Sequence, residues 1–248
     1  SRYGLVAFGS SLDQSGPFAR NVEDAAAAVQ AVSGHDRRDS TSLDAPPISP
    51  NLDRGYLRGL RIALPKELFA GSAEPGVLGA VREAIEALSR EGAEFEEVSV
   101  ASVEYGVTTY YVIAPAEASS NHARFDGVRY GGRLEGAGHI GTVAKTRGEL
   151  FGHEVKARIM IGTYALSAGY YDAYYYRAQQ VRARMTAEFE SLFERFDLVL
   201  SPTSPVVAFK LGALTHDPMA MKLLDLCTIP ANLGGFPALS LNCGFSEG

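Results

Sequence analysis

Two charged residues stand inside otherwise apolar stretches of the sequence, and a charge in such surroundings needs a partner. On a helix with 3.6 residues per turn, Arg158 shares a face with Phe151, Val155, Ile161, Gly162 and Ala165. A guanidinium is a planar fork that holds a carboxylate through two parallel hydrogen bonds. Arg158 is therefore a candidate for binding a carboxylate, and an internal salt bridge is the competing interpretation.

Asp225 shows the same pattern on a short predicted helix, where its neighbours are Leu223, Leu224, Leu226 and Cys227. Its carboxylate can accept an ammonium group. If Arg158 and Asp225 face one pocket, they can hold the carboxylate and the amine of a free α-amino acid. They can equally pair with each other, and the sequence leaves both arrangements open.

The stretch from Tyr110 to Gly131, YYVIAPAEASSNHARFDGVRYG, carries more polar and aromatic side chains than a plain core segment. A helix that begins before Tyr110 should be interrupted at Pro115, because proline lacks the backbone N–H and its ring clashes with the preceding turn. The stretch therefore predicts a broken helix that lines a cavity. A tyrosine-rich helix packed on a sheet is the alternative.

Several other kinds of chemistry lack their usual residue patterns here. No serine lies in a G-x-S-x-G turn, and the five histidines show no H-E-x-x-H spacing. The glycine-rich segment 131–141 lacks the Lys-Ser/Thr pair of a phosphate loop. We therefore expect no metal site, and no nucleophile with an activating base is visible.

The composition is typical of an ordinary globular protein, with 46% hydrophobic and 21% charged residues among 248. No run of about 18 apolar residues predicts a membrane span. The net charge of −6 argues against a surface that binds nucleic acid directly, so any RNA should be held by a partner. Two cysteines are too few for a disulfide framework, which favours a reducing, cytoplasmic setting.

Predicted strands and helices alternate along the chain, a pattern typical of an α/β layered fold. Strands are predicted at residues 3–8, 60–64, 95–100, 197–201 and 238–242. Helices are predicted at 22–32, 75–90, 149–167, 170–185, 186–196 and 217–227. Asn21 is the expected N-cap of the first of these helices. Residues 60–100 should form a βαβ unit with parallel strands and a right-handed crossover. Segments 35–53 and 131–141 are expected to be loops.

Four segments together resemble the A subunits of aspartyl/glutamyl-tRNA(Asn/Gln) amidotransferases, which are amidase-signature enzymes. The segments are SRYGLVAFGSSLDQSGPFARNVEDAA, YYVIAPAEASSNHARFDGVRYG, ALSAGYYDAYYYRAQQVR and TIPANLGGFPALSLNCG. The resemblance implies one amidase-signature α/β domain over residues 1–248, truncated at both ends. It also implies a mixed central sheet that helices cover on both faces.

The resemblance further implies a glutaminase, which hydrolyses glutamine and passes the ammonia to a B subunit. There Glu-tRNA(Gln) or Asp-tRNA(Asn), activated with ATP and magnesium, is amidated. The chain itself is expected to bind glutamine and no cofactor, and to assemble with B and C subunits in a heterotrimer. Contact with tRNA is expected mainly through the B subunit, in the cytoplasm and without a membrane.

The glutamine-binding residues of these A subunits fall on positions already noted. An Arg in the EVK-x-R helix corresponds to Arg158, and an Asp just before T-x-P-x-NL-x-G corresponds to Asp225. The Tyr that opens the YY-x-I/L-A segment is Tyr110, which is expected to contact the substrate. The residues expected to support the pocket wall and its entrance are Glu117, Ser119, Ser120 and Asn121.

The catalytic Ser-cis-Ser-Lys set of these A subunits precedes the RYGL motif, so the resemblance places all three residues upstream of Ser1 and none in this chain. The chain is accordingly expected to be an internal piece that orients the substrate. One alternative is an amidase-signature hydrolase of another amide. The other is a non-catalytic fragment that only binds a ligand or serves as a scaffold.

Overall fold

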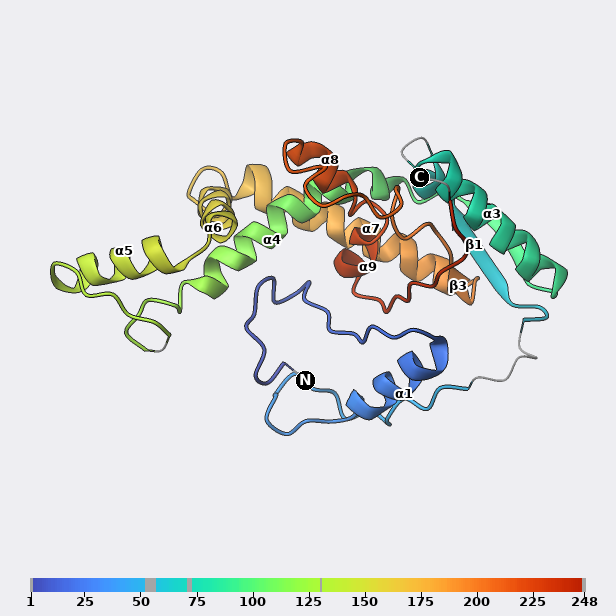
Figure 1. The fold of residues 1–248 in the computed structure, drawn as a ribbon, viewed down its shortest axis with the longest axis horizontal. Helices are drawn as coiled ribbons and strands as arrows, with labels where there is room; N and C mark the ends of the chain where they lie inside the picture. Colours follow the sequence, from blue (N-terminus) through green and yellow to red (C-terminus); the bar gives the residue numbers. More distant parts are fainter. Residues whose placement is uncertain (1, 52–56, 71–72, 130, 247–248) are drawn as a thin grey trace.

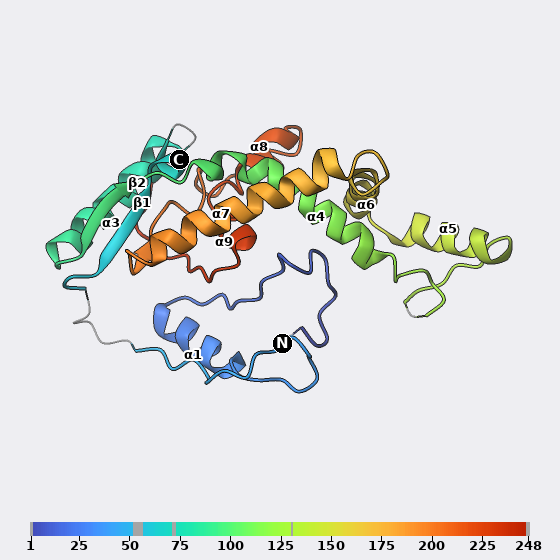
Figure 2. The same ribbon diagram turned by 180° about the vertical axis from the view of Figure 1, so that it is seen from behind.

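The computed structural model describes residues 2–51, 57–70, 73–129 and 131–246. Its long axis extends from a small sheet with helix α3 (Pro75–Arg90) at one end to helix α5 (Gly138–Leu150) at the other (Figure 1). The N-terminal segment and helix α1 (Val22–Val32) run along one side of this body, as the reverse view also shows (Figure 2). The alternating strands and helices confirm the predicted α/β class.

Three described strands form one parallel sheet in the order β2-β1-β3. They are β1 (Arg61–Pro65), β2 (Glu94–Val98) and β3 (Leu198–Val199). Helix α3 lies between β1 and β2 and ends at Arg90, and Gly92, whose φ of 102° suits glycine, turns the chain toward β2. Because β1 and β2 pair in parallel, the predicted βαβ unit is confirmed. The handedness of the crossover stays a prediction. Within the described residues the sheet is parallel, whereas the resemblance implied a mixed one.

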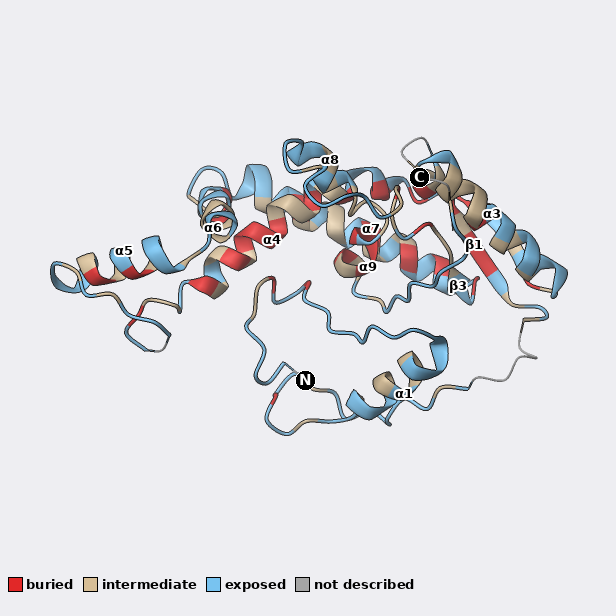
Figure 3. Cartoon of the chain, in the orientation of Figure 1, coloured by how far each residue is buried: buried red, intermediate tan, exposed pale blue. Residues whose placement is uncertain are grey.

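The core lies where the sheet meets helices α4 (Gly106–His122) and α7 (Arg177–Phe193). Ala63 of β1 packs in one buried cluster with Met185 of α7, which is fully buried. Burying a side chain of this size stabilises the fold by about 1.5–3 kcal/mol. Figure 3 shows the buried residues concentrated along α4, α7 and the strands, while α1 is largely exposed.

The expected break at Pro115 is wrong, because α4 runs through this residue without interruption. Proline cannot donate to the carbonyl of Tyr111, so the helix loses one hydrogen bond there. Pro115 is fully buried, and the flanking Ala114 and Ala116 are buried too. Packing on both sides of the proline therefore holds the turn that the local sequence would break.

Two predicted boundaries in the next region need correction. The loop expected at 131–141 ends at Ala137, because α5 begins at Gly138. The helix predicted at 149–167 corresponds to α6 (His153–Ala165), whereas residues 149–150 are the end of α5, a helix that the sequence missed. Phe151 and Gly152 both adopt extended backbone, which separates the two helices.

Ser1 and Tyr130 enter the predictions but lie outside the described part of the chain. The catalytic set is expected upstream of Ser1, and Tyr130 belongs to the stretch from Tyr110 to Gly131. The expected place of the catalytic set therefore stays a prediction.

The tyrosine-rich segment and the amphipathic segment after it form one long rod. A π-helical turn, η2 (Asp172–Tyr176), leads directly into α7. The helix predicted at 217–227 is the shorter α8 (Pro218–Leu223), which the carboxylate of Asp217 caps. The sequence missed α9 (Ile229–Gly234), η1 (Ala101–Tyr105) and the single turn α2 (Lys66–Phe69).

The strands predicted at 3–8 and 238–242 are wrong, because neither segment pairs with a described strand. The backbone N–H groups of Phe8 and Gly9 donate to the carboxylate of Asp13, which closes a turn in place of a ladder. Leu239 is 70% exposed, so its segment has no sheet to pack against within the described residues. An apolar alternation alone does not make a strand.

The remaining local predictions agree with the structure. Asn21 caps α1 by accepting a hydrogen bond from the backbone of Asp24. Residues 35–51 contain neither helix nor strand, and the last two positions of the predicted loop 35–53 fall outside the described residues. No described helix is both long and apolar enough to cross a membrane.

Candidate functional site

Helices α4 and α6 lie unusually close together, and this contact places the candidate site residues. A Cβ atom built on Gly162 of α6 would lie 1.9 Å from the carbonyl oxygen of Pro115 in α4. Only glycine allows the two backbones to approach this closely. The contact brings Tyr110 and Tyr111, one turn before Pro115, to the side of Arg158, one turn before Gly162.

Arg158 lies at the edge of the core, with 31% of its side chain exposed. Its Nε lies 3.2 Å from Oε1 of Glu154, one turn earlier on the same helix. The guanidinium also stands over the ring of Phe8, at 5.3 Å from the ring centroid. Glu154 is 71% exposed, and such a surface pair contributes only about 0.3–0.5 kcal/mol. The internal salt bridge is therefore present, but it is too weak to prevent Arg158 from binding another carboxylate.

Asp225 lies in the turn that follows α8, half-buried beside α4. Burial raises the pKa of its carboxyl above the ordinary value, while the Tyr111 hydroxyl and the charge of Arg158 oppose that rise. The Tyr111 hydroxyl donates a long hydrogen bond of 3.5 Å to Oδ2 of Asp225. Lys222 lies 4.8 Å from the centroid of the Tyr111 ring. A carboxylate thus faces a tyrosine pair in a partly dry environment.

Tyr110 and Tyr111 connect the two charged residues. Their rings meet edge to face at 5.1 Å between centroids. Burial raises the pKa of both hydroxyls, and at each one Asp225 raises the pKa further while Arg158 lowers it. Both charges therefore act on the same two phenols. Within the described residues, no direct ion pair joins Arg158 to Asp225, so the structure brings them to one place without pairing them.

The N-terminal segment closes over this group of residues, which the sequence did not foresee. Its backbone carbonyl at Phe8 accepts a hydrogen bond of 2.9 Å from Nδ2 of Asn121, and Glu117 accepts one of 2.9 Å from the backbone N–H of Ser11. Glu117 and Asn121 thus hold the N-terminal segment against α4, and their role in a pocket wall stays a prediction. Phe8 itself was missed because it was placed in a strand, and Tyr111 because the motif that contains both tyrosines assigned substrate contact to Tyr110 alone.

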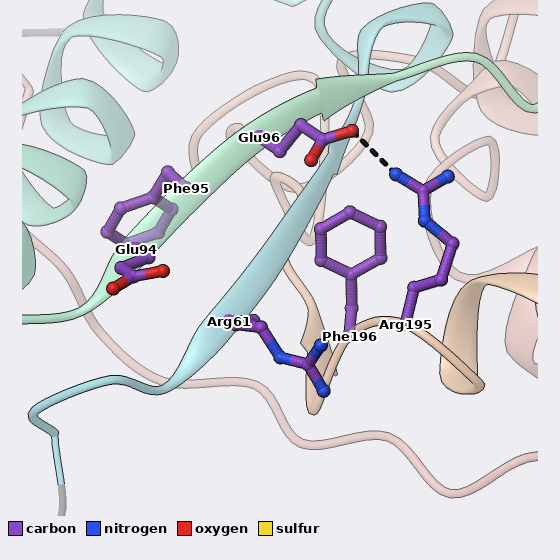
Figure 4. A pocket seen from close by; sticks show the side chains of 6 residues that line it. All are labelled: Arg61, Glu94, Phe95, Glu96, Arg195 and Phe196. Carbon is purple, nitrogen blue, oxygen red and sulfur yellow. Dashed lines mark hydrogen bonds and ion pairs between the residues drawn. The ribbon is translucent and has the colours of Figure 1, made fainter.

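A hollow lies beside strands β1 and β2, away from the tyrosine pair, and Figure 4 shows the side chains that line it. Its six lining residues are Arg61, Glu94, Phe95, Glu96, Arg195 and Phe196. An ion pair of 2.8 Å joins Arg195 to Glu96, and Arg61 pairs with Asp197 at 3.7 Å. Arg61 and Glu94 open their strands, whereas ligands of parallel sheets bind near the carboxyl ends. This hollow is a weaker candidate than the tyrosine pair.

Among the described residues, no group of three His, Cys, Asp or Glu side chains is placed to hold a metal ion. Cys227 and Cys243 are both free thiols. Burial raises the pKa of the Cys227 thiol to about 11, so it is protonated at neutral pH and is a poor nucleophile. The chemistry that Arg158, Asp225 and the tyrosine pair can perform is therefore the recognition of charged groups.

Comparisons with known proteins agree with this picture. A family model described as "Amidase" matches residues 1–248. The A subunit of glutamyl-tRNA(Gln) amidotransferase from Chloroflexus aggregans is 55% identical over 249 aligned positions, covering 100% of this chain and 51% of the relative. Its counterpart from Moorella thermoacetica is 54% identical, with the same coverage. The chain thus spans about half the length of the curated relatives it matches.

Solved structures show the same fold. The crystal structure of the A subunit of glutamyl-tRNA(Gln) amidotransferase from Thermotoga maritima superposes with a TM-score of 0.73 at 42% identity, covering 95% of this chain and 46% of that one. A bacterial aryl acylamidase of the amidase signature family superposes with a TM-score of 0.59 at 21% identity, covering 89% and 44%. The amidase-signature α/β fold predicted from the sequence is confirmed.

Proposed function

The chain belongs to the amidase family, and on this premise we propose that it forms the glutamine-binding part of a glutamine amidohydrolase subunit. The ammonia that this enzyme releases serves to convert Glu-tRNA(Gln) or Asp-tRNA(Asn) to Gln-tRNA(Gln) or Asn-tRNA(Asn). Relatives that are 55% and 54% identical are named as A subunits of glutamyl-tRNA(Gln) amidotransferase, which supports this substrate class.

The observation that carries the proposal is the meeting of Arg158 and Asp225 at one tyrosine pair. Free glutamine bears a carboxylate and an ammonium group on its α-carbon, and a guanidinium and a carboxylate are their complementary partners. Arg158 uses Nε toward Glu154, and in the described part of the chain no hydrogen bond engages its terminal amino groups. Those groups bind the α-carboxylate, Asp225 binds the α-ammonium group, and the Tyr110 hydroxyl contacts the substrate.

This arrangement contributes to the reaction by position. Holding both α-substituents fixes the side-chain amide carbonyl for attack, which replaces an unfavourable encounter with a prearranged one. The attacking group is the serine of a Ser-cis-Ser-Lys set, which we place upstream of Ser1. That serine attacks the amide carbon, Lys and the cis-Ser pass a proton to the departing ammonia, and water then releases glutamate.

We place the remaining chemistry on partner subunits. The B subunit binds ATP, magnesium and tRNA, and a C subunit completes a heterotrimer, so this chain needs no cofactor of its own. The complex acts as a carbon–nitrogen ligase in protein biosynthesis. Its substrates are cytoplasmic aminoacyl-tRNAs, which sets the cytoplasm as the compartment. The relatives are named as A subunits, which supports the part of this proposal that concerns further subunits.

Calorimetric titration with L-glutamine tests the proposal on the complete gene product, meaning the whole polypeptide that its gene encodes. A hydrogen bond to a charged group contributes about 1.5–3 kcal/mol, so Arg158→Ala and Asp225→Ala should each weaken binding by about 10- to 100-fold. Lys156→Met is the matched control, because Lys156 lies on the same helix but donates to the carbonyl of Gly148. Its affinity for glutamine should equal that of the wild type.

Unchanged affinity after either site substitution would overturn the roles of Arg158 and Asp225. Hydrolysis of simple amides without any response to glutamine would favour another amidase-signature hydrolase. Glutamine binding without turnover in the assembled complex would favour a role in binding alone. Ammonia release, measured alongside the titration, separates these outcomes.

A further inference from the structure

Arg182 of α7 joins two segments that are far apart in the sequence. Its Nη1 donates to Oγ of Ser11 at 2.6 Å, and its Nη2 donates to the Ser11 carbonyl at 3.0 Å. Its Nε donates to the carbonyl of Leu233 in α9 at 2.8 Å. All three nitrogens of the guanidinium are therefore engaged, in the planar geometry that arginine provides and lysine does not.

The first segment is the Phe8 loop, which we define as residues 8–13. The Asp13 carboxylate accepts hydrogen bonds from the backbone N–H groups of Phe8 at 2.9 Å and Gly9 at 3.0 Å. The Ser11 hydroxyl donates to the carboxylate of Glu117 in α4 while it accepts from Arg182. The loop is thereby fixed between α4 and α7, and Phe8 is fixed under the guanidinium of Arg158.

The second segment is α9, which adjoins Asp225. The backbone N–H of Ile229, the first residue of α9, donates to the carbonyl of Asp225 at 2.9 Å. Nδ2 of Asn232 donates to the carbonyl of Leu12 at 2.8 Å, so α9 also holds the Phe8 loop directly. The guanidinium of Arg182 therefore links the Phe8 loop, which lies beneath Arg158, to α9, whose first backbone N–H is hydrogen-bonded to Asp225.

We propose that Arg182 is a positioning residue for substrate binding, which sets the separation of Arg158 and Asp225 through the Phe8 loop and α9. The inference rests on the proposed function, because it assumes that these two residues bind the α-substituents of glutamine. A ligand held at both ends is sensitive to the distance between its two partners. Without Arg182, the Phe8 loop keeps its hydrogen bond from Asn232 to Leu12, but the three hydrogen bonds of the guanidinium are lost, so the loop can shift relative to α9 and the ring of Phe8 is no longer fixed under Arg158.

Glutamine titration of the complete gene product tests this proposal with Arg182→Met, Arg182→Lys and the control Arg184→Met. Arg184 lies two residues along α7 and is 70% exposed, where it pairs with Glu188 at 2.8 Å. Coupling between residues of one network amounts to factors of about 2 to 100, so we expect Arg182→Met to weaken binding by about tenfold. Arg182→Lys should be intermediate, and Arg184→Met should match the wild type.

A double-mutant cycle separates positioning from a general loss of structure. In the Arg158→Ala background, Arg182→Met should weaken binding by less than about twofold, because the residue through which it acts is gone. The same tenfold loss in both backgrounds would overturn the proposal. Equal affinity of Arg182→Met and the wild type would overturn it as well. A wild-type protein that does not bind glutamine would instead refute the proposed function.

Ser11→Ala provides the second variant if Arg182→Met does not fold. It removes the hydroxyl that joins Arg182 to Glu117 and leaves the backbone contacts of Ser11 in place. We expect about threefold weaker glutamine binding with an unchanged melting temperature, in line with the smaller part of the network removed. Unchanged binding in Ser11→Ala would contradict the proposed link through the Phe8 loop.

Discussion

Replacing Gly162 with alanine tests whether the backbone contact between α4 and α6 determines the geometry of the candidate site. The added Cβ would lie 1.9 Å from the Pro115 carbonyl oxygen, 2.3 Å from its carbon and 2.8 Å from the nitrogen of Ala116. All three are backbone atoms inside a buried helix, so no side chain can rotate to make room. The two helices themselves must separate.

The size of this movement follows from the contact distances. Opening the gap from 1.9 Å to the 3.4 Å of ordinary contact requires a shift of about 1.5 Å. Overpacking a core usually costs about 1–3 kcal/mol, and a backbone obstacle places this substitution at the upper end, near 3 kcal/mol. The shift moves Arg158, one turn from Gly162, relative to Tyr110 and Tyr111.

Thermal unfolding and glutamine titration of the complete gene product provide the assay. Gly162→Ala should lower the melting temperature and weaken glutamine binding, and a shift of about 1 Å in an active site can cost about a hundredfold in rate. Gly79→Ala is the matched control, since Gly79 lies within α3 and a Cβ there meets no atom within 4 Å. That substitution should stabilise the protein by about 0.5–1 kcal/mol.

Two results would refute the reasoning. If Gly162→Ala and Gly79→Ala changed stability alike, the close approach of α4 and α6 would not exist in solution. If Gly162→Ala were destabilised but bound glutamine with wild-type affinity, the spacing of these helices would not set the site. The second result would leave the description of the fold unchanged, but it would show that glutamine binding does not depend on the position of Arg158 relative to the tyrosine pair.

Two further predictions concern Asp225 and the cap of α1. Burial raises the pKa of Asp225 above 3.8, so its charge is lost at a higher pH than that of an exposed aspartate, and glutamine affinity should decline there as pH falls. The pH dependence of stability has the opposite sign. Asp225 contributes fully to folding only below its unfolded pKa, and this contribution is lost as the pH rises. Asp225→Asn should therefore raise the melting temperature at neutral pH and abolish the decline of glutamine affinity at acidic pH. Asn21→Ala removes the hydrogen bond of 2.7 Å to the backbone of Asp24, which costs about 1 kcal/mol. Because no residue of α1 is buried, hydrogen exchange should accelerate within α1 while the global melting temperature stays nearly constant.

The parts of the fold that local sequence determines were predictable. Helix α3 was placed at its observed ends, because a proline opens it and a glycine with positive φ closes it. The Asn21 cap was foreseen for the same reason, since the side chain satisfies a donor only three residues away. Such signals need no knowledge of the rest of the chain.

The parts that depend on distant contacts were not predictable. Pro115 stays within α4 because α6 and the core hold that turn, and nothing near Pro115 in the sequence records this support. The apolar residues at 3–8 and 238–242 have strand character but no described strand beside them. A strand is defined by its neighbour, so its own composition is insufficient.

The residues of the candidate site show the same difference between local sequence signals and distant contacts. Arg158 and Asp225 were identified because each is a charge among apolar neighbours, an anomaly visible within a few residues. Phe8, Tyr111 and Arg182 were missed because their importance arises from folding. Ser11 and Arg182, for example, are separated by 171 positions. The groups that we propose to bind glutamine are visible in the sequence, whereas those that we propose to position them require the structure.

Asp225 illustrates why a charged residue among apolar neighbours points to a role in binding. An ionised carboxylate that is partly withdrawn from water destabilises the fold near neutral pH, so folding alone would favour an asparagine at this position. The same withdrawal strengthens its attraction for an ammonium group, because the local dielectric constant is lower than that of water. The attraction between Asp225 and the ammonium group of a bound ligand therefore offsets the free energy that the buried charge costs in the empty site. The opposite effects of Asp225→Asn on stability and on glutamine affinity distinguish a residue retained for binding from one retained for the fold.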